Sequence, residues 1–181
     1  MKKIICLYGG PGAGKSTTCA GLFYRLKQKG FNCEMNLEYV KQWVWEGRSI
    51  QVGDQTYLFA KQSRRERIYI EKGLDFIITD SPLVLTHFYG LKYDEMEQKY
   101  NTSLNMLKNH HEFCKSRGYK TEHFVLNRKK PYNPAGRYQT EEEAKSYDTE
   151  ITDLLDILGI KYNYVDGDET SVESILSIIG V

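Results

Sequence analysis

Short apolar runs and helical stripes alternate along this chain, and the alternation predicts an α/β domain. Apolar runs with strand character occur at residues 3–8, 31–37, 75–80, 119–127 and 161–166. Between them, apolar residues recur at spacings of three and four, which is the period of an amphipathic helix. Such a β/α series predicts a five-stranded parallel sheet with helices on both faces, in three layers.

The second and third of these runs differ in pattern. In 31–37, apolar and polar residues alternate, with Asn32, Glu34 and Asn36 on the polar face, as expected of a strand at the edge of a sheet or under a thin cover. The run at 75–80 contains a continuous apolar core, as expected of a central parallel strand. We therefore expect the second strand at the edge and the third inside the sheet.

The helix from 140 to 158 is the best marked, because Thr140 and Glu143 form a capping-box pair before an apolar stripe. Residues 90–118 predict one helix, or two helices broken near 101–103. No low-complexity tract or linker divides the chain, so we expect one domain, 1–181.

The turn between the first strand and the first helix fits the motif G-x-x-x-x-G-K-[ST]. Glycines let the backbone N–H groups surround a polyphosphate, and the following helix presents its positive end to the anion. Lys15 can reach the β- and γ-phosphates, and the Ser16 hydroxyl can ligate Mg²⁺. We therefore predict that the chain binds ATP and Mg²⁺. The predicted nucleotide-binding residues are Gly10, Gly12, Ala13, Gly14, Lys15, Ser16 and Thr17.

Composition narrows the range of partners. With 181 residues, 40% of them hydrophobic, and a net charge of +1, the chain has no overall attraction to nucleic acid or to a membrane surface. Its four cysteines are scattered without a C-x-x-C pair, which predicts reduced thiols in a cytoplasmic protein. No segment is predicted to span a membrane.

Two carboxylates follow predicted strands. Asp80 ends the central run, where a carboxylate holds Mg²⁺ together with Ser16; its alternative role is to cap the helix that Pro82 opens. The next residue is Ser81 and not glutamate, which favours transfer to an organic hydroxyl over ATP hydrolysis. Glu38 follows the second strand, where it can take a proton from an acceptor hydroxyl, or serve only as a first-turn helix acid.

A basic helix, predicted over 55–71, carries Gln62 and Arg65 on one face, where they could contact the acceptor. A solvated helix face is the alternative. Trp43 could stack on a planar acceptor, although most tryptophans belong to a core. His111 and Cys114 have the spacing of half a zinc site, but no second half follows in the sequence, so helix-surface residues are the favoured interpretation.

A second basic group lies in the segment from Arg128 to Arg137, which contains two prolines and a glycine. Loops of this length in compact domains are usually lids or binding loops. We therefore predict a lid at about 128–139, with Arg128 and Arg137 acting on the transferring phosphoryl group. The alternative is an exposed loop that is basic by chance.

Together these segments resemble small P-loop kinases. The segments that carry the resemblance are the phosphate loop, residues 37–40, 59–62 and 79–82, the predicted lid, and the strand end at residues 164–167. The resemblance is to the ribosylnicotinamide-kinase-like AAA domain proteins, many of them phage-encoded, related to deoxynucleoside and nucleotide kinases. It implies the strand order 2-3-1-4-5 with a mobile lid. It also implies Gln62 and Arg65 at the acceptor's base, Arg128 and Arg137 on phosphates, and Asp166 and Asp168 near the adenine. Ser81 departs from the arginine that deoxynucleoside kinases carry after the acid.

We therefore expect a Mg-ATP-dependent kinase that phosphorylates a hydroxyl of a nucleoside- or nucleotide-like acceptor. A kinase that acts on 5-hydroxymethylpyrimidine bases in phage DNA is the first alternative. An ATP-dependent switch or binding module is the second.

Overall fold

The computed structural model describes residues 2–51 and 53–181, so positions 1 and 52 of the predicted domain 1–181 lie outside the described residues. The elements are, in order, β1 (Lys2–Tyr8), α1 (Lys15–Gln28), β2 (Cys33–Asn36), α2 (Val40–Trp45), α3 (Asp54–Glu71), β3 (Phe76–Thr79), α4 (Leu83–Tyr93), α5 (Glu95–Tyr100), α6 (Thr102–Ser116), β4 (Tyr119–Asn127), α7 (Glu141–Ile157), β5 (Asn163–Asp166) and α8 (Ser171–Ile179).

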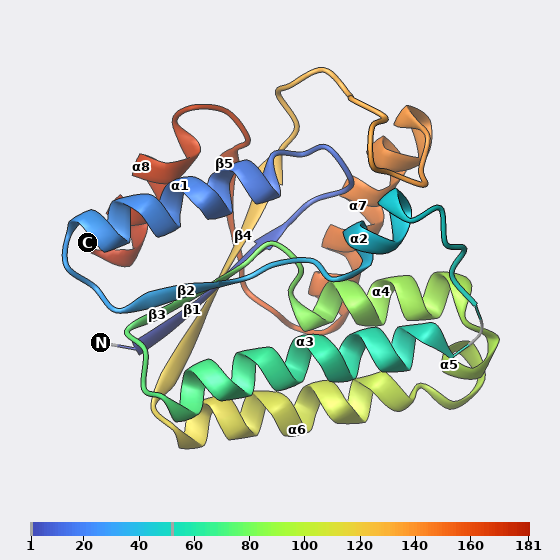
Figure 1. The fold of residues 1–181 in the computed structure, drawn as a ribbon, viewed down its shortest axis with the longest axis horizontal. Helices are drawn as coiled ribbons and strands as arrows, with labels where there is room; N and C mark the ends of the chain where they lie inside the picture. Colours follow the sequence, from blue (N-terminus) through green and yellow to red (C-terminus); the bar gives the residue numbers. More distant parts are fainter. Residues whose placement is uncertain (1, 52) are drawn as a thin grey trace.

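The five strands form one parallel sheet in the order β2-β3-β1-β4-β5 (Figure 1), which confirms the predicted α/β fold and strand order. β1 lies in the middle, where Ile4 is in register with Ile77 of β3 and with Thr121 of β4. Because all strands run the same way, their carboxyl ends meet at one edge. The loops that leave this edge carry the residues of the candidate site.

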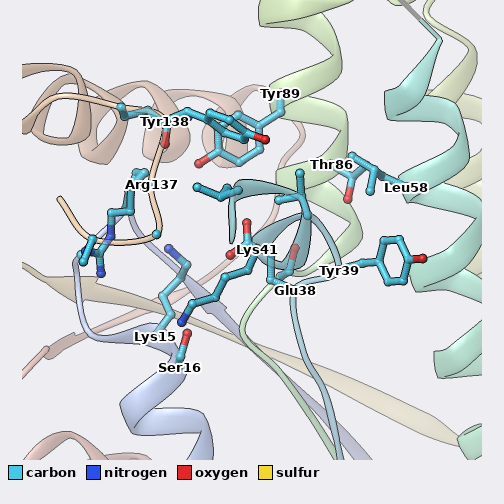
Figure 2. Close-up of a pocket in the computed structure, with 18 of the residues that line it drawn as sticks. Lys15, Ser16, Glu38, Tyr39, Lys41, Leu58, Thr86, Tyr89, Arg137 and Tyr138 are labelled. Carbon is cyan, nitrogen blue, oxygen red and sulfur yellow. The ribbon is translucent and has the colours of Figure 1, made fainter. Parts of the chain in front are cut away.

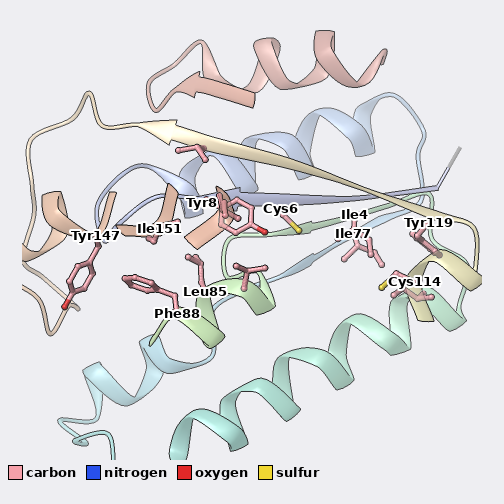
Figure 3. Close-up of a cluster of buried hydrophobic side chains, with 14 of the residues drawn as sticks. Ile4, Cys6, Tyr8, Ile77, Leu85, Phe88, Cys114, Tyr119, Tyr147 and Ile151 are labelled. Carbon is pink, nitrogen blue, oxygen red and sulfur yellow. The ribbon is translucent and has the colours of Figure 1, made fainter. Parts of the chain in front are cut away.

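The two faces of the sheet are covered by different helices. Successive residues of β1 point to opposite faces, so Ile4 packs with the residues of α3, α4, α6 and α7, while Ile5 packs with those of α1 and α8. Figure 3 shows the first of these clusters, in which Leu85 and Phe88 of α4 lie over the sheet beside Ile151 of α7. Burial on both faces explains why β1 and β3 read as continuous apolar runs.

The edge strand differs from its prediction in one respect. β2 is an edge strand, as expected, but Asn36 is fully buried and does not face water. Its Nδ2 donates to the Gln62 carbonyl oxygen at 3.3 Å and lies 3.4 Å from Glu66 Oε2. The reason is that α3 covers this face, and its polar groups bind the Asn36 amide nitrogen in place of water, while Asn36 Oδ1 is buried without a hydrogen-bond partner among the described residues.

Two predicted helix boundaries are confirmed. Thr140 caps α7 through a capping box with Glu143. The chain breaks between α5 and α6 at Asn101, which has a left-handed φ of 48°. Asparagine tolerates this conformation better than most residues, so the break occurs where the sequence predicts it.

The predicted lid, residues 128–139, connects β4 to α7 over the carboxyl edge of the sheet (Figure 1). Its Tyr138 hydroxyl donates to the carbonyl oxygen of Arg48, just after α2. A Cβ atom on Gly136 would lie 2.8 Å from Trp45, so only glycine permits this approach. The segment therefore packs against the end of α2.

Among the described residues, no helix is both long and apolar enough to cross a bilayer.

Candidate active site

The phosphate loop lies between β1 and α1, as its sequence predicts. Gly14 has a φ of 104°, which a side chain would strain, and α1 begins at the next residue. A Cβ atom on Gly10 would lie 2.2 Å from the Ala144 carbonyl oxygen. The loop is thus pressed against α7, and its glycines are required by its shape.

Lys15 opens α1 and turns its ammonium group back over the loop. The Nζ atom donates to the carbonyl oxygens of Gly9 at 2.6 Å and Gly10 at 3.1 Å. Burial lowers the pKa of Lys15, while the Glu38 and Asp80 carboxylates oppose that shift. These carboxylates therefore favour the charged form of Lys15 at the place where phosphate oxygens would bind.

Glu38 and Asp80 are brought together by the sheet. Asp80 follows β3 and is 4% exposed, and its Oδ1 accepts a 2.9 Å hydrogen bond from the backbone N–H of Glu38. Burial raises the pKa of Glu38, and the Lys15 ammonium opposes the rise. Ser16, from the phosphate loop, lines the same cavity as Glu38. The predicted base and the predicted magnesium ligands therefore meet at one edge of the sheet.

A cavity of about 430 Å³ joins these residues to a second group on the helices. In Figure 2, Lys15, Ser16 and Arg137 lie on one side, Thr86 lies on the other, and Glu38 lies between them. The helical side is lined by Gln55, Leu58, Gln62, Thr86, Tyr89 and Tyr93, all of them uncharged. The cavity thus has a cationic end and a neutral end.

Gln62 is the predicted acceptor residue that the structure places in this cavity. It is 3% exposed, and its Nε2 donates to the carbonyl oxygens of Asn36 at 3.1 Å and Ser81 at 3.2 Å. Both bonds use the amide nitrogen, so the amide plane is fixed. Tyr89 and Thr86 were missed by sequence reasoning. Their signal is a spacing of three residues on α4, which is otherwise strongly apolar.

Trp43 and Arg65 are placed outside the cavity lining. Trp43 is 4% exposed, with the Arg48 guanidinium 3.6 Å from its ring centroid and the Tyr57 ring stacked at 6.0 Å. Arg65 donates to the Leu37 carbonyl oxygen at 3.0 Å. Both residues support the walls around Glu38, so direct acceptor contact by either would require a different arrangement.

Arg128 binds the phosphate loop and connects it to α7. Its guanidinium donates to the Asp148 carboxylate at 2.8 Å, the Pro11 carbonyl at 2.9 Å and the Ala144 carbonyl at 3.1 Å. Asp148 also accepts the Gly10 N–H at 2.6 Å. The predicted phosphate contact of Arg128 would require it to exchange these partners. Sequence reasoning missed Asp148, which is one more acid on a polar helix face.

Arg137, in contrast, lines the cavity from the lid, and its charge acts on the Glu38 carboxylate. Asp166 and Asp168 lie beyond the phosphate loop. Asp166 pairs with Lys129 at 3.3 Å, and Asp168 accepts from Thr170 at the start of α8. Adenine contact by these two aspartates stays a prediction.

Three comparisons with known proteins found similarities to this chain. A family model described as AAA domain matches residues 4–173. A curated protein of Thermoplasma volcanium named "Putative adenylate kinase" is 44% identical over 43 residues, which are 24% of this chain and 26% of that protein. The match therefore spans about a quarter of the relative's length.

Two solved structures are also similar. The crystal structure of APE1195 superposes with a TM-score of 0.53 at 16% identity, covering 99% of this chain and 95% of that one. An APS kinase CysC mutant from Mycobacterium tuberculosis gives 0.43 at 13% identity, over 87% and 98% of the two chains. At these identities, the likeness to APE1195 concerns the fold alone.

Proposed function

The chain belongs to the AAA domain family of P-loop proteins, and on that premise we propose that it is a Mg²⁺- and ATP-dependent kinase of a nucleoside-like acceptor. The observation that carries the proposal is the position of Glu38. Its carboxylate lies between the phosphate-loop residues and the neutral end of one cavity (Figure 2). An acceptor in that end would present its hydroxyl to Glu38 and to the γ-phosphate together.

The donor set at the phosphate end fits magnesium. The Ser16 hydroxyl and the Asp80 carboxylate are hard oxygen ligands, which Mg²⁺ prefers alongside phosphate oxygens and water. When bound, the ion would neutralise negative charge that builds up on the β- and γ-phosphates. Lys15 and the loop N–H groups would hold the same phosphates, and Arg137 would approach them from the lid.

In the proposed reaction, an acceptor hydroxyl oxygen attacks the γ-phosphorus and the bond to the bridging β-γ oxygen breaks, which releases ADP. The hydroxyl proton passes to the Glu38 carboxylate. Burial raises the pKa of Glu38, so its conjugate acid holds the proton more strongly than an exposed glutamate would. The residue after Asp80 is Ser81, so the chain has no adjacent glutamate to activate water.

The neutral end of the cavity favours an uncharged acceptor. Lys15, Lys41 and Arg137 lie toward the phosphate end, and the helical wall contributes only amide, hydroxyl, phenol and aliphatic groups. A monophosphate there would lack a cationic partner, and leaving a buried charge unpaired is costly. Amide and hydroxyl groups beside aromatic rings suit the base and sugar of a nucleoside.

A transfer assay with γ-labelled ATP tests this proposal. Nucleosides, nucleoside monophosphates and DNA containing 5-hydroxymethylpyrimidine are offered in parallel, with a no-acceptor control. We expect labelled phosphate on a nucleoside-class acceptor and its loss in Lys15→Ala. Gln62→Leu should raise the acceptor KM at least tenfold with little effect on ATP binding, because Gln62 lines the helical side of the cavity and its amide holds the Asn36 and Ser81 carbonyl oxygens there.

The other outcomes would contradict the proposal in distinct ways. Label on DNA alone would identify the polymer kinase. ATP binding without transfer to any acceptor, with nucleotide-dependent capture of a protein, would identify a switch.

A further inference from the structure

A second set of chemically active side chains lies between α3 and α6, away from the nucleotide site. Glu66 on α3 and His110 and Cys114 on α6 bring a carboxylate, an imidazole and a thiol within 4.8 Å of one another. The two α6 residues are four apart, so they lie on one face of that helix. α3 and α6 pack side by side, as Figure 1 shows.

The three groups are buried and oriented. The Glu66 and His110 side chains are 6% and 8% exposed, and Cys114 is 3% exposed. His110 Nε2 lies 2.7 Å from Glu66 Oε1, and its Nδ1 is 3.1 Å from the Ser63 hydroxyl. Metal-bound histidines characteristically bind a polar partner through the second nitrogen, which fixes the ring. Asn36 Nδ2, at 3.4 Å, gives Glu66 a similar support.

We propose that Glu66, His110 and Cys114 form a binding site for Zn²⁺ or a similar divalent transition metal. Thiolate and imidazole ligands select such ions over Mg²⁺. Around a tetrahedral zinc with bond lengths of about 2.0–2.3 Å, ligand atoms lie roughly 3.3–3.6 Å apart. The observed ligand atoms all lie within 4.8 Å of one another, and the 2.7 Å contact between Glu66 Oε1 and His110 Nε2 would have to open by roughly 0.6 Å to admit the ion.

The fourth coordination position would open into a cavity of its own. Glu66, His110 and Cys114 line a space of about 670 Å³, together with His111 and His123 among others. This cavity and the nucleotide cavity share no lining residue among those described. Three protein ligands and one open position are the arrangement in which zinc binds water or a small anion. The proposed zinc ligands are therefore distinct from the residues assigned to the phosphates and to proton transfer, and Asn36 connects the two sites by contacting both Glu66 and Gln62.

Zinc binding by the full chain tests the proposal. The protein is stripped with a chelator, returned to excess Mg²⁺ so that the phosphate loop is supplied, and titrated with Zn²⁺ against a chromophoric competitor. We expect one zinc per chain. Co²⁺ in its place should give the near-ultraviolet absorption of a thiolate ligand. Cys114→Ser and Glu66→Gln should weaken Zn²⁺ binding at least tenfold, and Cys114→Ser should abolish the Co²⁺ band.

Matched variants separate a metal site from a simple buried ion pair. His111→Ala removes a histidine from the same helix and cavity, and Cys33→Ser removes a buried thiol on the opposite face of the sheet; both should keep full affinity. Ser63→Ala should weaken binding about tenfold with the ligands intact. The rise in Tm on adding zinc is measured for each variant against its own stripped form, so a change in stability alone cannot mimic the result.

Two outcomes would overturn the proposal. In the first, the wild-type chain binds no more zinc than Cys114→Ser. In the second, His111→Ala loses as much affinity as Cys114→Ser, which would place the metal elsewhere in the cavity.

Discussion

The backbone N–H of Glu38 donates a 2.9 Å hydrogen bond to the carboxylate of Asp80. This bond ties the loop after β2 to the end of β3, so the predicted base and a predicted magnesium ligand hold one another in place. Asp80 thus holds the protein backbone through this bond, and binding a cation is its second, predicted role. Substitutions can separate the two, because an amide oxygen can replace a carboxylate as a hydrogen-bond acceptor but is a weaker ligand for Mg²⁺.

Asp80→Asn should raise the Mg²⁺ concentration for half-maximal activity about tenfold or more and lower kcat, with the fold retained. Asp80→Ala should do the same and also lower Tm, since the Glu38 N–H then loses its acceptor. Magnesium titrations and thermal unfolding of both variants measure the two effects. An unchanged magnesium titration in Asp80→Asn would leave Asp80 with its structural role alone.

Glu38→Gln should lower kcat by about a hundredfold or more, because the amide cannot accept the hydroxyl proton. The pH profile gives the second measurement. Burial raises the pKa of Glu38 above its ordinary value of 4.5, and a base works only when deprotonated, so kcat should increase with pH along a limb centred above pH 4.5. That limb should disappear in Glu38→Gln. A loss below threefold would mean that Glu38 serves only to shape the loop.

Arg128 and Arg137 should fail in different ways. Arg128→Ala leaves the Asp148 carboxylate, 27% exposed, without its partner, and should lower the free energy of unfolding by about 1–3 kcal/mol. Arg137→Ala should leave stability unchanged and lower kcat more than ATP affinity, since the lid acts on charge that develops during transfer. Urea unfolding measures the stability of both variants, and kcat and ATP titration calorimetry measure their activity and ATP affinity. If Arg128→Ala kept its stability and lost ATP affinity, the phosphate contact predicted from the family resemblance would hold.

His123 should make the fold sensitive to acid. Burial, with the charge of His111 as a smaller cause, lowers the pKa of His123 to about 4, and its Nδ1 lies 2.9 Å from the Tyr8 hydroxyl. Between pH 6.5 and about 4, His123 is protonated in the unfolded chain but stays neutral in the folded chain. The free energy of unfolding should therefore fall as the pH is lowered through that window, by up to about 3 kcal/mol. Denaturant titrations in a chelating buffer measure it. His123→Gln should have a flatter dependence, and an equally steep one would assign the effect to other groups.

The sheet and the phosphate loop were predictable because both depend on short-range sequence patterns. A strand, a glycine turn and a helix that follow one another need no distant contact to be recognised. The cluster of Glu66, His110 and Cys114 shows the limit of that reasoning. His111 and Cys114 have a suggestive spacing, yet His110 is the residue that faces Glu66. Neighbouring helix positions differ by about 100° in direction, and only the packing of α6 against α3 decides between them.

The same limit applies to contacts that join distant parts of the chain. Arg128 was assigned to phosphate because it lies in a basic loop, but its partners come from the phosphate loop and from α7. Asp148, 138 residues from Gly10, holds that loop through a hydrogen bond for which the sequence contains no pattern. The sequence predicted Lys15, Glu38 and Arg137 in the site but not Asp148, because only the packing of α7 against the phosphate loop brings Asp148 to Gly10.

The two ends of the nucleotide cavity are built from different parts of the fold. The phosphate end comes from the turn after β1, the segment after β3 and the predicted lid. The backbone of the turn after β1 is fixed by close contacts, such as the one between Gly10 and Ala144 of α7. The opposite wall comes from side chains on α3 and α4, such as Leu58 and Thr86. Substitutions at these helix positions, natural or selected in the laboratory, should thus change which acceptor the proposed kinase takes, while the phosphate end that would bind ATP stays the same.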